Sequence, residues 1–153
     1  MTVISELEDA IVAVGAVIDE ALAFFGQTPD RTAAPGGSWG PKEVLAHLVW
    51  WHTFTCESVE GVLAGREPQP PSRPVEAINA EAAAQAAGTS VATLAEQFGA
   101  THARLIEAMR RLPDPSVVVM RRSDGAAFDA PSRLNTLARH VAGHLAELRQ
   151  GAA

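Results

Sequence analysis

Apolar residues recur at helical spacings in several long stretches of this chain, and this periodicity constrains the fold more than any other feature of the sequence. In the first stretch they mark one face of a helix, at Ile4, Leu7, Ile11, Ile18, Leu22 and Phe25. A stripe of this kind predicts an amphipathic helix with one buried face. The stretch ends where glycine and proline accumulate after Gly26, because these residues interrupt helices. A loop is expected from there to about Trp39.

The second predicted helix has a clear start signal. Gly40 is expected to be the N-cap and Pro41 to take the first helical position, while Glu43 adds an acid to the first turn. The helix is expected to end at Leu63 or the residue after it. The connection 65–74 is rich in proline and cannot continue a helix, because proline removes the amide donor and restricts the residue before it.

The rest of the chain is also mostly helical in its pattern. Residues 75–87 are alanine-rich and helix-prone, and residues 90–112 form another amphipathic stretch. Residues 113–131 read as a short extended excursion with a turn, and residues 132–150 form the last helix. The apolar stripe of this last helix consists of Leu134, Leu137, Val141, Leu145 and Leu148. Four amphipathic helices joined by long loops predict an all-α four-helix bundle, with residues 1–153 as one domain.

Composition narrows the range of functions. The formal net charge is −6 and the basic residues form only short pairs, so nucleic acid is not an expected partner. No apolar run approaches the roughly 20 residues of a membrane span, so no membrane partner is expected either. The N-terminal stretch carries acids where a signal peptide would carry basic residues, and Cys56 is the one cysteine. These features predict a cytoplasmic protein.

Two of the five histidines lie one helical turn apart. His140 and His144 fall in the last predicted helix, where a spacing of four residues places both imidazoles on the same side, as metal ligands need. They flank the apolar stripe of that helix. His47 falls within the apolar arc of the second helix and is expected to be buried. By itself, a buried histidine of this kind is more often a core residue hydrogen-bonded to a carbonyl than a ligand.

The positions of the other histidines, the cysteine and the tryptophans give weaker indications of a functional site. His52 lies on another side of the second helix and is interpreted as a surface or rim residue. His102 shares the stripe of the 90–112 helix, so it is either a core residue or a cavity-lining proton carrier. Cys56 is placed toward the polar side of its helix without a charged partner, so it is not expected to be a nucleophile. Three aromatic residues are interpreted as core or interface rather than as a binding box: Trp39, Trp50 and Trp51.

The segment 38–48 reads SWGPKEVLAHL and is followed far downstream by His140-x-x-x-His144. Together these motifs resemble the DinB/YfiT-like superfamily over nearly the whole chain. They are most similar to the branch with mycothiol-dependent maleylpyruvate isomerase and the thiol S-transferases, where a tryptophan shortly precedes the second helix and a histidine follows within it. The resemblance implies that His47, His140 and His144 bind one divalent metal ion. Homodimers are common in the superfamily, and many members carry an asparagine early in the third helix, which matches Asn79 here.

Three neutral imidazoles leave open positions on zinc, the expected ion, or on nickel or iron. The resemblance therefore implies a metal-dependent enzyme, a thiol S-transferase, isomerase or hydrolase. It would activate a low-molecular-weight thiol, of the mycothiol or bacillithiol type, or water for attack on a small-molecule electrophile. The other hypothesis is a non-catalytic metal- or ligand-binding stress-response protein, because a fold does not establish a reaction.

Several roles stay open at this level. Glu43, one turn before His47, is either an orienting carboxylate for an imidazole N–H or only a first-turn acid. Asn79 and His102 are the two candidates for a catalytic role beside the metal. The connections 65–74 and 113–131 either cap the metal or only join helices.

Overall fold

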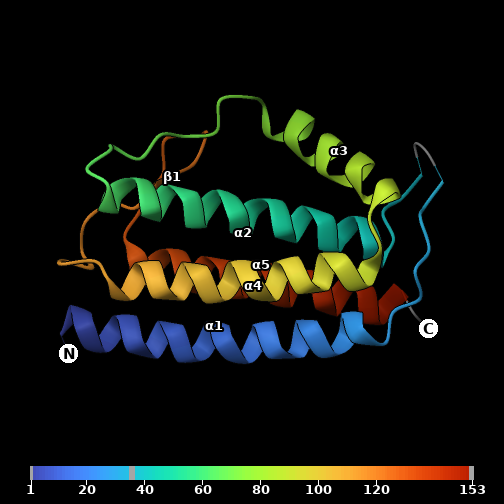
Figure 1. Ribbon diagram of the computed structural model, residues 1–153, viewed down its shortest axis with the longest axis horizontal. Coiled ribbons are helices and arrows are strands. Elements are labelled where there is room, and N and C mark those ends of the chain that lie inside the picture. Colours follow the sequence, from blue (N-terminus) through green and yellow to red (C-terminus); the bar gives the residue numbers. More distant parts are fainter. Residues whose placement is uncertain (1, 35–36, 152–153) are drawn as a thin grey trace.

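A computed structural model describes residues 2–34 and 37–151, and helices make up most of it (Figure 1). The elements in chain order are α1 (Val3–Gly26), α2 (Pro41–Leu63), α3 (Val75–Gln85), the 3-10 turn η1 (Ala86–Gly88), α4 (Val91–Arg110), β1 (Met120–Arg121), β2 (Ala127–Phe128) and α5 (Ala130–Gly151). Four long helices lie side by side, with α1 against α5 and α4, and α2 against α4. The shorter α3 lies over α2.

The predicted all-α bundle is therefore confirmed, with the 75–87 stretch forming a fifth helix and its terminal turn. The buried stripes of the long helices meet in one core, which includes Leu7, Leu45, Phe98 and Leu134. Within the described residues, no helix has the length and apolarity needed to cross a membrane.

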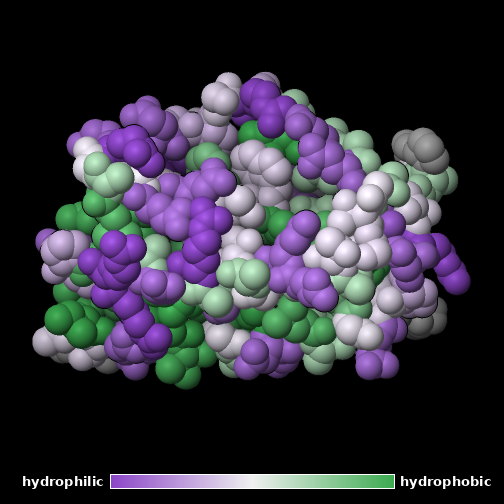
Figure 2. All heavy atoms as spheres, viewed as in Figure 1, coloured by the Kyte–Doolittle hydropathy of each residue, from purple (hydrophilic) through white to green (hydrophobic). Residues whose placement is uncertain are grey.

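One member of the first predicted stripe is exposed, and Leu22 is only partly buried. The Ile4 side chain is 65% exposed, because it lies in the first turn of α1 at an end of the bundle. On the face shown in Figure 2, hydrophobic residues also reach the surface toward this end of the molecule. The periodicity was right for the residues that follow, since Leu7, Ile11 and Ile18 are all buried.

The start of α2 is held as the sequence predicts. Gly40 is the N-cap, and its backbone N–H donates to Oε1 of Glu43 at 3.0 Å. The other carboxylate oxygen of Glu43 accepts from the backbone N–H of Ala33 at 3.2 Å. The side chain of Lys42 is buried and its Nζ lies 3.0 Å from a carboxylate oxygen of Asp30. These contacts fasten the preceding loop onto the first turn of α2.

The 113–131 excursion contains a small hairpin. Strands β1 and β2 pair antiparallel, and Gly125 occupies the turn with φ of +90°, a conformation that favours glycine. The hydroxyl of Ser58 on α2 donates to the backbone oxygen of Val119 at 2.6 Å, while the Met120 side chain is fully buried. The hairpin is therefore anchored beside α2 rather than projecting into solvent.

Candidate metal centre

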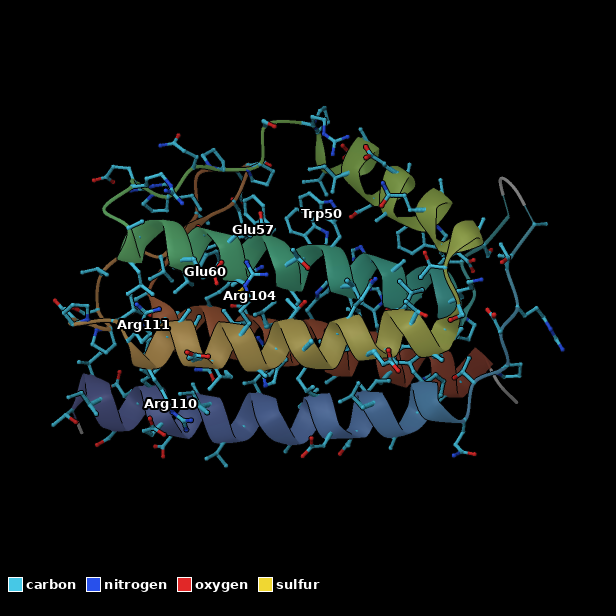
Figure 3. All side chains as sticks on the ribbon, in the orientation of Figure 1. Trp50, Glu57, Glu60, Arg104, Arg110 and Arg111 are labelled. Atoms are coloured by element: carbon cyan, nitrogen blue, oxygen red, sulfur yellow. The ribbon has the colours of Figure 1, made fainter. Side chains whose placement is uncertain are left out.

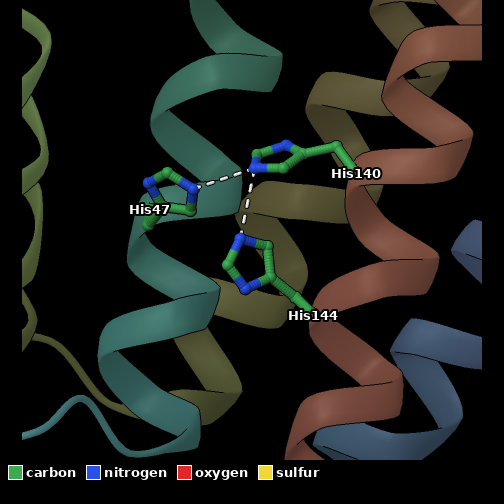
Figure 4. Close-up of side chains that lie close together, drawn as sticks. All are labelled: His47, His140 and His144. Atoms are coloured by element: carbon green, nitrogen blue, oxygen red, sulfur yellow. Dashed lines mark hydrogen bonds between the residues drawn. The ribbon is translucent and has the colours of Figure 1, made fainter.

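Helix α2 contributes one histidine and α5 contributes two to a group that we call the three-histidine cluster: His47, His140 and His144 (Figure 4). The Nε2 atom of His140 lies 3.0 Å from Nε2 of His47 and 3.2 Å from Nε2 of His144. One ring nitrogen from each residue lies within 4.8 Å of the other two. The structure thus brings together the three residues that the sequence suggested as ligands, and they could hold a metal ion.

The orientation of the His47 ring is fixed by a neighbour on α3. The indole N–H of Trp51 donates to Oδ1 of Asn79 at 2.9 Å, which identifies that atom as an acceptor. The same oxygen lies 3.0 Å from Nδ1 of His47, so this ring nitrogen carries the proton. In the neutral ring, Nε2 then has a free lone pair that points into the cluster. Asn79 therefore leaves Nε2 of His47 free to bind a metal ion.

The contacts within the cluster suit a cation better than a set of hydrogen bonds. A ring nitrogen offers either one proton or one lone pair, yet Nε2 of His140 faces two other Nε2 atoms. Tetrahedral zinc with Zn–N bonds of about 2.0–2.1 Å would hold two nitrogens about 3.3–3.4 Å apart. The observed separations of 3.0 and 3.2 Å are within a few tenths of an ångström of that spacing. The donor set therefore fits a divalent ion that favours imidazole.

Burial keeps the cluster uncharged at neutral pH. Desolvation, with the charge of His144 as a second cause, lowers the pKa of His47 to about 4, although the hydrogen bond that His47 donates to Asn79 opposes this shift. Desolvation, followed by the charges of His47 and His144, lowers the pKa of His140 to about 4. Burial also lowers the pKa of His144, against the opposing charge of Glu147. The three lone pairs are thus available without prior loss of protons.

A cavity of about 300 Å³ lies beside the cluster. Its lining comes from α2, α3, the hairpin and α5: His47, Trp51, Val75, Asn79, Met120, Arg122, Arg133, Thr136 and His140. The 113–131 excursion therefore forms one wall of the site. In the described part of the chain, the 65–74 connection contributes no residue to this lining.

Of the remaining candidates from the sequence, Glu43 and His102 do not contact the cluster, whereas Asn79 does. Both carboxylate oxygens of Glu43 bond backbone amides, so the first-turn role is correct and the orienting role is wrong. His102 is half-buried, lies outside the three-histidine cluster, and lines a separate hollow with Ile11 and Asp19. Asn79 contacts His47 directly, as described above. Of the two catalytic candidates, only Asn79 lines the cavity beside the cluster.

The interpretation of His52 as a surface residue is wrong. Its side chain is fully buried, packs edge-on against the ring of Phe98, and has Nε2 at 3.1 Å from Nδ1 of His102. The other ring nitrogen of His52 has no hydrogen-bond partner among the described residues. Helix α2 is covered on more than one side, because α3, α4, α5 and the hairpin all contact it.

Cys56 was likewise misplaced on the polar side, since its side chain is fully buried. Close by, Glu60 of α2 accepts two hydrogen bonds from the guanidinium of Arg104 on α4, at 2.8 and 2.5 Å (Figure 3). Burial, with the charge of Glu60 as the next cause, raises the pKa of Cys56 to about 11. The thiol is therefore protonated at neutral pH, which suits the prediction that it is not a nucleophile.

The buried His52 predicts a pH-dependent stability. Burial, followed by the charge of His102, lowers its pKa to about 3, while the unfolded chain protonates it near pH 6.5. Because the unfolded state then binds one more proton, the free energy of unfolding should fall by about 1.4 kcal/mol per pH unit below about pH 6 from this residue alone. Urea unfolding of chelator-treated protein at about pH 7, 6 and 5 measures this slope.

His52→Phe is expected to reduce that slope by about 1.4 kcal/mol per pH unit, because phenylalanine cannot titrate. Only the slope is compared, so a change in overall stability caused by the new ring does not affect the result. An identical slope in both proteins would show that His52 is not held neutral in the folded state.

Two residues of the site were missed in the sequence. Trp51 was interpreted only as core or interface, but its indole N–H fixes the amide of Asn79. Arg133 was not considered, although it precedes His140 by seven residues and so shares its side of α5. That spacing is the signal that could have identified it.

Comparison with known proteins agrees with this architecture. The DinB superfamily matches residues 6–148. The crystal structure of mycothiol-dependent maleylpyruvate isomerase superimposes with a TM-score of 0.74 at 19% identity, covering 93% of this chain and 60% of the isomerase. A mutant of the isomerase gives a TM-score of 0.75 at 17% identity with the same coverage.

At this identity the likeness to the isomerase shows the fold, and the present chain spans only 60% of the isomerase's length. Comparison with curated proteins gives no significant match. The family match, in contrast, covers most of each of the four long helices and the whole three-histidine cluster. The chain therefore belongs to the DinB superfamily.

Proposed function

We propose that this protein binds one divalent metal ion, zinc first among the alternatives, through His47, His140 and His144. We further propose that it uses the ion to activate a low-molecular-weight thiol, of the mycothiol or bacillithiol type, or water for attack on a small electrophile. The observation that carries the proposal is the convergence of three Nε2 atoms beside a cavity. A bound ion with an open position would lower the pKa of such a nucleophile toward neutrality.

The protein's own side chains have defined tasks in this reaction. Asn79 keeps the proton of His47 on Nδ1, so that Nε2 is ready as a ligand. The buried surroundings keep all three imidazoles neutral. Trp51, Val75 and Met120 supply an apolar wall that limits water around the reacting atoms. The nucleophile must come from outside, because the Cys56 thiol is buried and protonated.

Support for a thiol comes from the fold, since the isomerase with which this chain shares its architecture is named as mycothiol-dependent. A free thiol with a pKa near 8.5 is only a few per cent thiolate at neutral pH, whereas coordination to a divalent cation deprotonates it. Because the chain spans 60% of that relative, its thiol and its substrate are proposals.

The test uses untagged protein loaded with zinc, nickel or iron and supplied with mycothiol, bacillithiol or glutathione and a model electrophile. The rate of adduct formation with the metal-loaded protein should exceed the rate with metal-free protein and the rate with the thiol alone. His144→Ala should reduce the rate to the metal-free level through loss of the ion, whereas Cys56→Ala should leave the rate unchanged. Adduct and hydrolysis product are measured together, which separates thiol transfer from attack by water.

One ion per chain without metal-dependent turnover of any thiol or of water would overturn the catalytic proposal and favour a metal-binding stress protein. Absence of bound metal after reconstitution with all three ions would overturn the metal site itself.

A further inference from the structure

The cavity beside the three-histidine cluster contains two arginines that the proposed function does not use. Arg133 lies in the first turn of α5 and Arg122 directly follows β1, and both line the cavity together with His140. Their guanidinium carbons lie 5.7 and 5.3 Å from the centre of the same Phe128 ring. One aromatic side chain therefore holds two positive charges close together.

Arg133 is a buried cation without a counter-ion. The residue is only 5% exposed, and its Nε donates to the neutral hydroxyl of Thr55 at 3.1 Å. Among the described residues, no carboxylate forms an ion pair with it. Desolvation, with the charge of Arg122 second, lowers its pKa to about 10, so it still carries its charge at neutral pH. An unpaired buried charge is costly, which calls for an anion on the cavity side.

Arg122 adds charge at the rim. It is exposed and already paired with Asp124, whose carboxylate oxygen lies 2.8 Å from its terminal nitrogen. Its charge is therefore partly neutralised and screened by solvent. Of the two arginines, Arg133 therefore has the greater capacity to bind an anion.

The spacing along α5 connects this charge to the cluster. Arg133 and His140 are seven residues apart, which places them on the same side of the helix about 10 Å apart along its axis. Thr136 lies between them and also lines the cavity. A small molecule with an anionic group at one end can thus contact Arg133 while its other end reaches His140.

We propose that Arg133, assisted by Arg122, forms a carboxylate-binding subsite, so that a small molecule handled at the three-histidine cluster carries a carboxylate. The proposal rests on the proposed function for the reaction, but the subsite itself needs no metal. The planar guanidinium fork matches a carboxylate in two parallel hydrogen bonds, and the buried position strengthens them. The carboxylate belongs either to the electrophile or to the thiol.

The first experiment titrates chelator-treated protein with succinate and with its uncharged analogue succinamide by calorimetry. Succinate should bind and succinamide should not. Arg133→Gln should weaken succinate binding about tenfold or more, the loss expected for a charge-assisted hydrogen bond. Arg149→Gln is the matched control, because Arg149 lies exposed on the same helix outside the cavity lining, and its succinate affinity should be unchanged.

The free energy of unfolding in urea shows whether Arg133 serves ligand binding or the stability of the fold. If Arg133 serves a ligand, Arg133→Gln removes an unpaired buried charge, and the metal-free variant should be as stable as the parent or more stable. A marked loss of stability together with unchanged succinate affinity would overturn the proposal. Absence of succinate binding to the folded parent would also overturn the proposal. That result would not bear on the metal site, because zinc binding is measured separately.

The source of the carboxylate is distinguished on zinc-loaded protein with 3-mercaptopropionate and 2-mercaptoethanol. If the thiol carries the group, Arg133→Gln should weaken the binding of 3-mercaptopropionate only. If the electrophile carries it, succinate should still bind to the parent saturated with 2-mercaptoethanol, and Arg133→Gln should weaken that binding about tenfold or more.

Discussion

His140→Ala is expected to reduce bound zinc from one ion per chain to nearly none. The Nε2 atom of His140 lies closest to both other ligand candidates, at 3.0 Å from His47 and 3.2 Å from His144, so its loss leaves two nitrogens without the central one. The affinity should fall by more than the roughly 10–100-fold that loss of a supporting residue costs. Competition with a chromophoric chelator measures the change directly.

The same variant should lose the stabilisation that zinc gives the parent. A ligand that binds only the folded state adds RT ln(1 + [L]/Kd), about 4 kcal/mol at 1,000 times the Kd, or about 10 °C in Tm for a chain of this length. Zinc should therefore raise the Tm of the parent and leave that of His140→Ala unchanged. His102→Ala is the control, because it removes a histidine outside the cluster and should retain zinc. Equal zinc affinity in His140→Ala and the parent would contradict the assignment.

Asn79→Leu is expected to weaken zinc binding by about 10–100-fold without removing a ligand. The amide oxygen of Asn79 accepts the hydrogen bond that keeps the His47 proton on Nδ1, and leucine has no acceptor for this N–H. The ring is then free to rotate or to place its proton on Nε2, which removes the lone pair from the cluster. Competition titration against the same chelator gives the affinity.

Two companion variants show whether the effect comes from the hydrogen bond. Asn79→Asp keeps an acceptor for His47 and should restore most of the affinity. Trp51→Phe removes only the donor that orients Asn79, so this variant should lose less zinc affinity than Asn79→Leu does. If Asn79→Asp weakens zinc binding as much as Asn79→Leu does, the hydrogen bond to His47 is not the cause.

The sequence was informative wherever a property depends on neighbours along one helix. The spacing of His140 and His144 puts them on one side of α5 whatever packs against it, and the pair meets His47 as expected. The start of α2 at Gly40 and Pro41 depends on local backbone amides, and it was placed correctly. The resemblance to the DinB superfamily supplied Asn79, which no periodicity distinguishes.

The burial of a helix face depends on what packs against it, which spacing along one helix does not contain. His52 and Cys56 lie off the main apolar stripe of α2, yet both are fully buried because other elements cover that helix on more than one side. Arg133 shares a side of α5 with His140, but it becomes a buried charge beside a cavity only because Phe128 of the preceding hairpin and Thr55 of α2 lie against it. Local periodicity therefore determined the helices and the histidine pair, while tertiary packing decided which polar side chains lost their water and now face the candidate site.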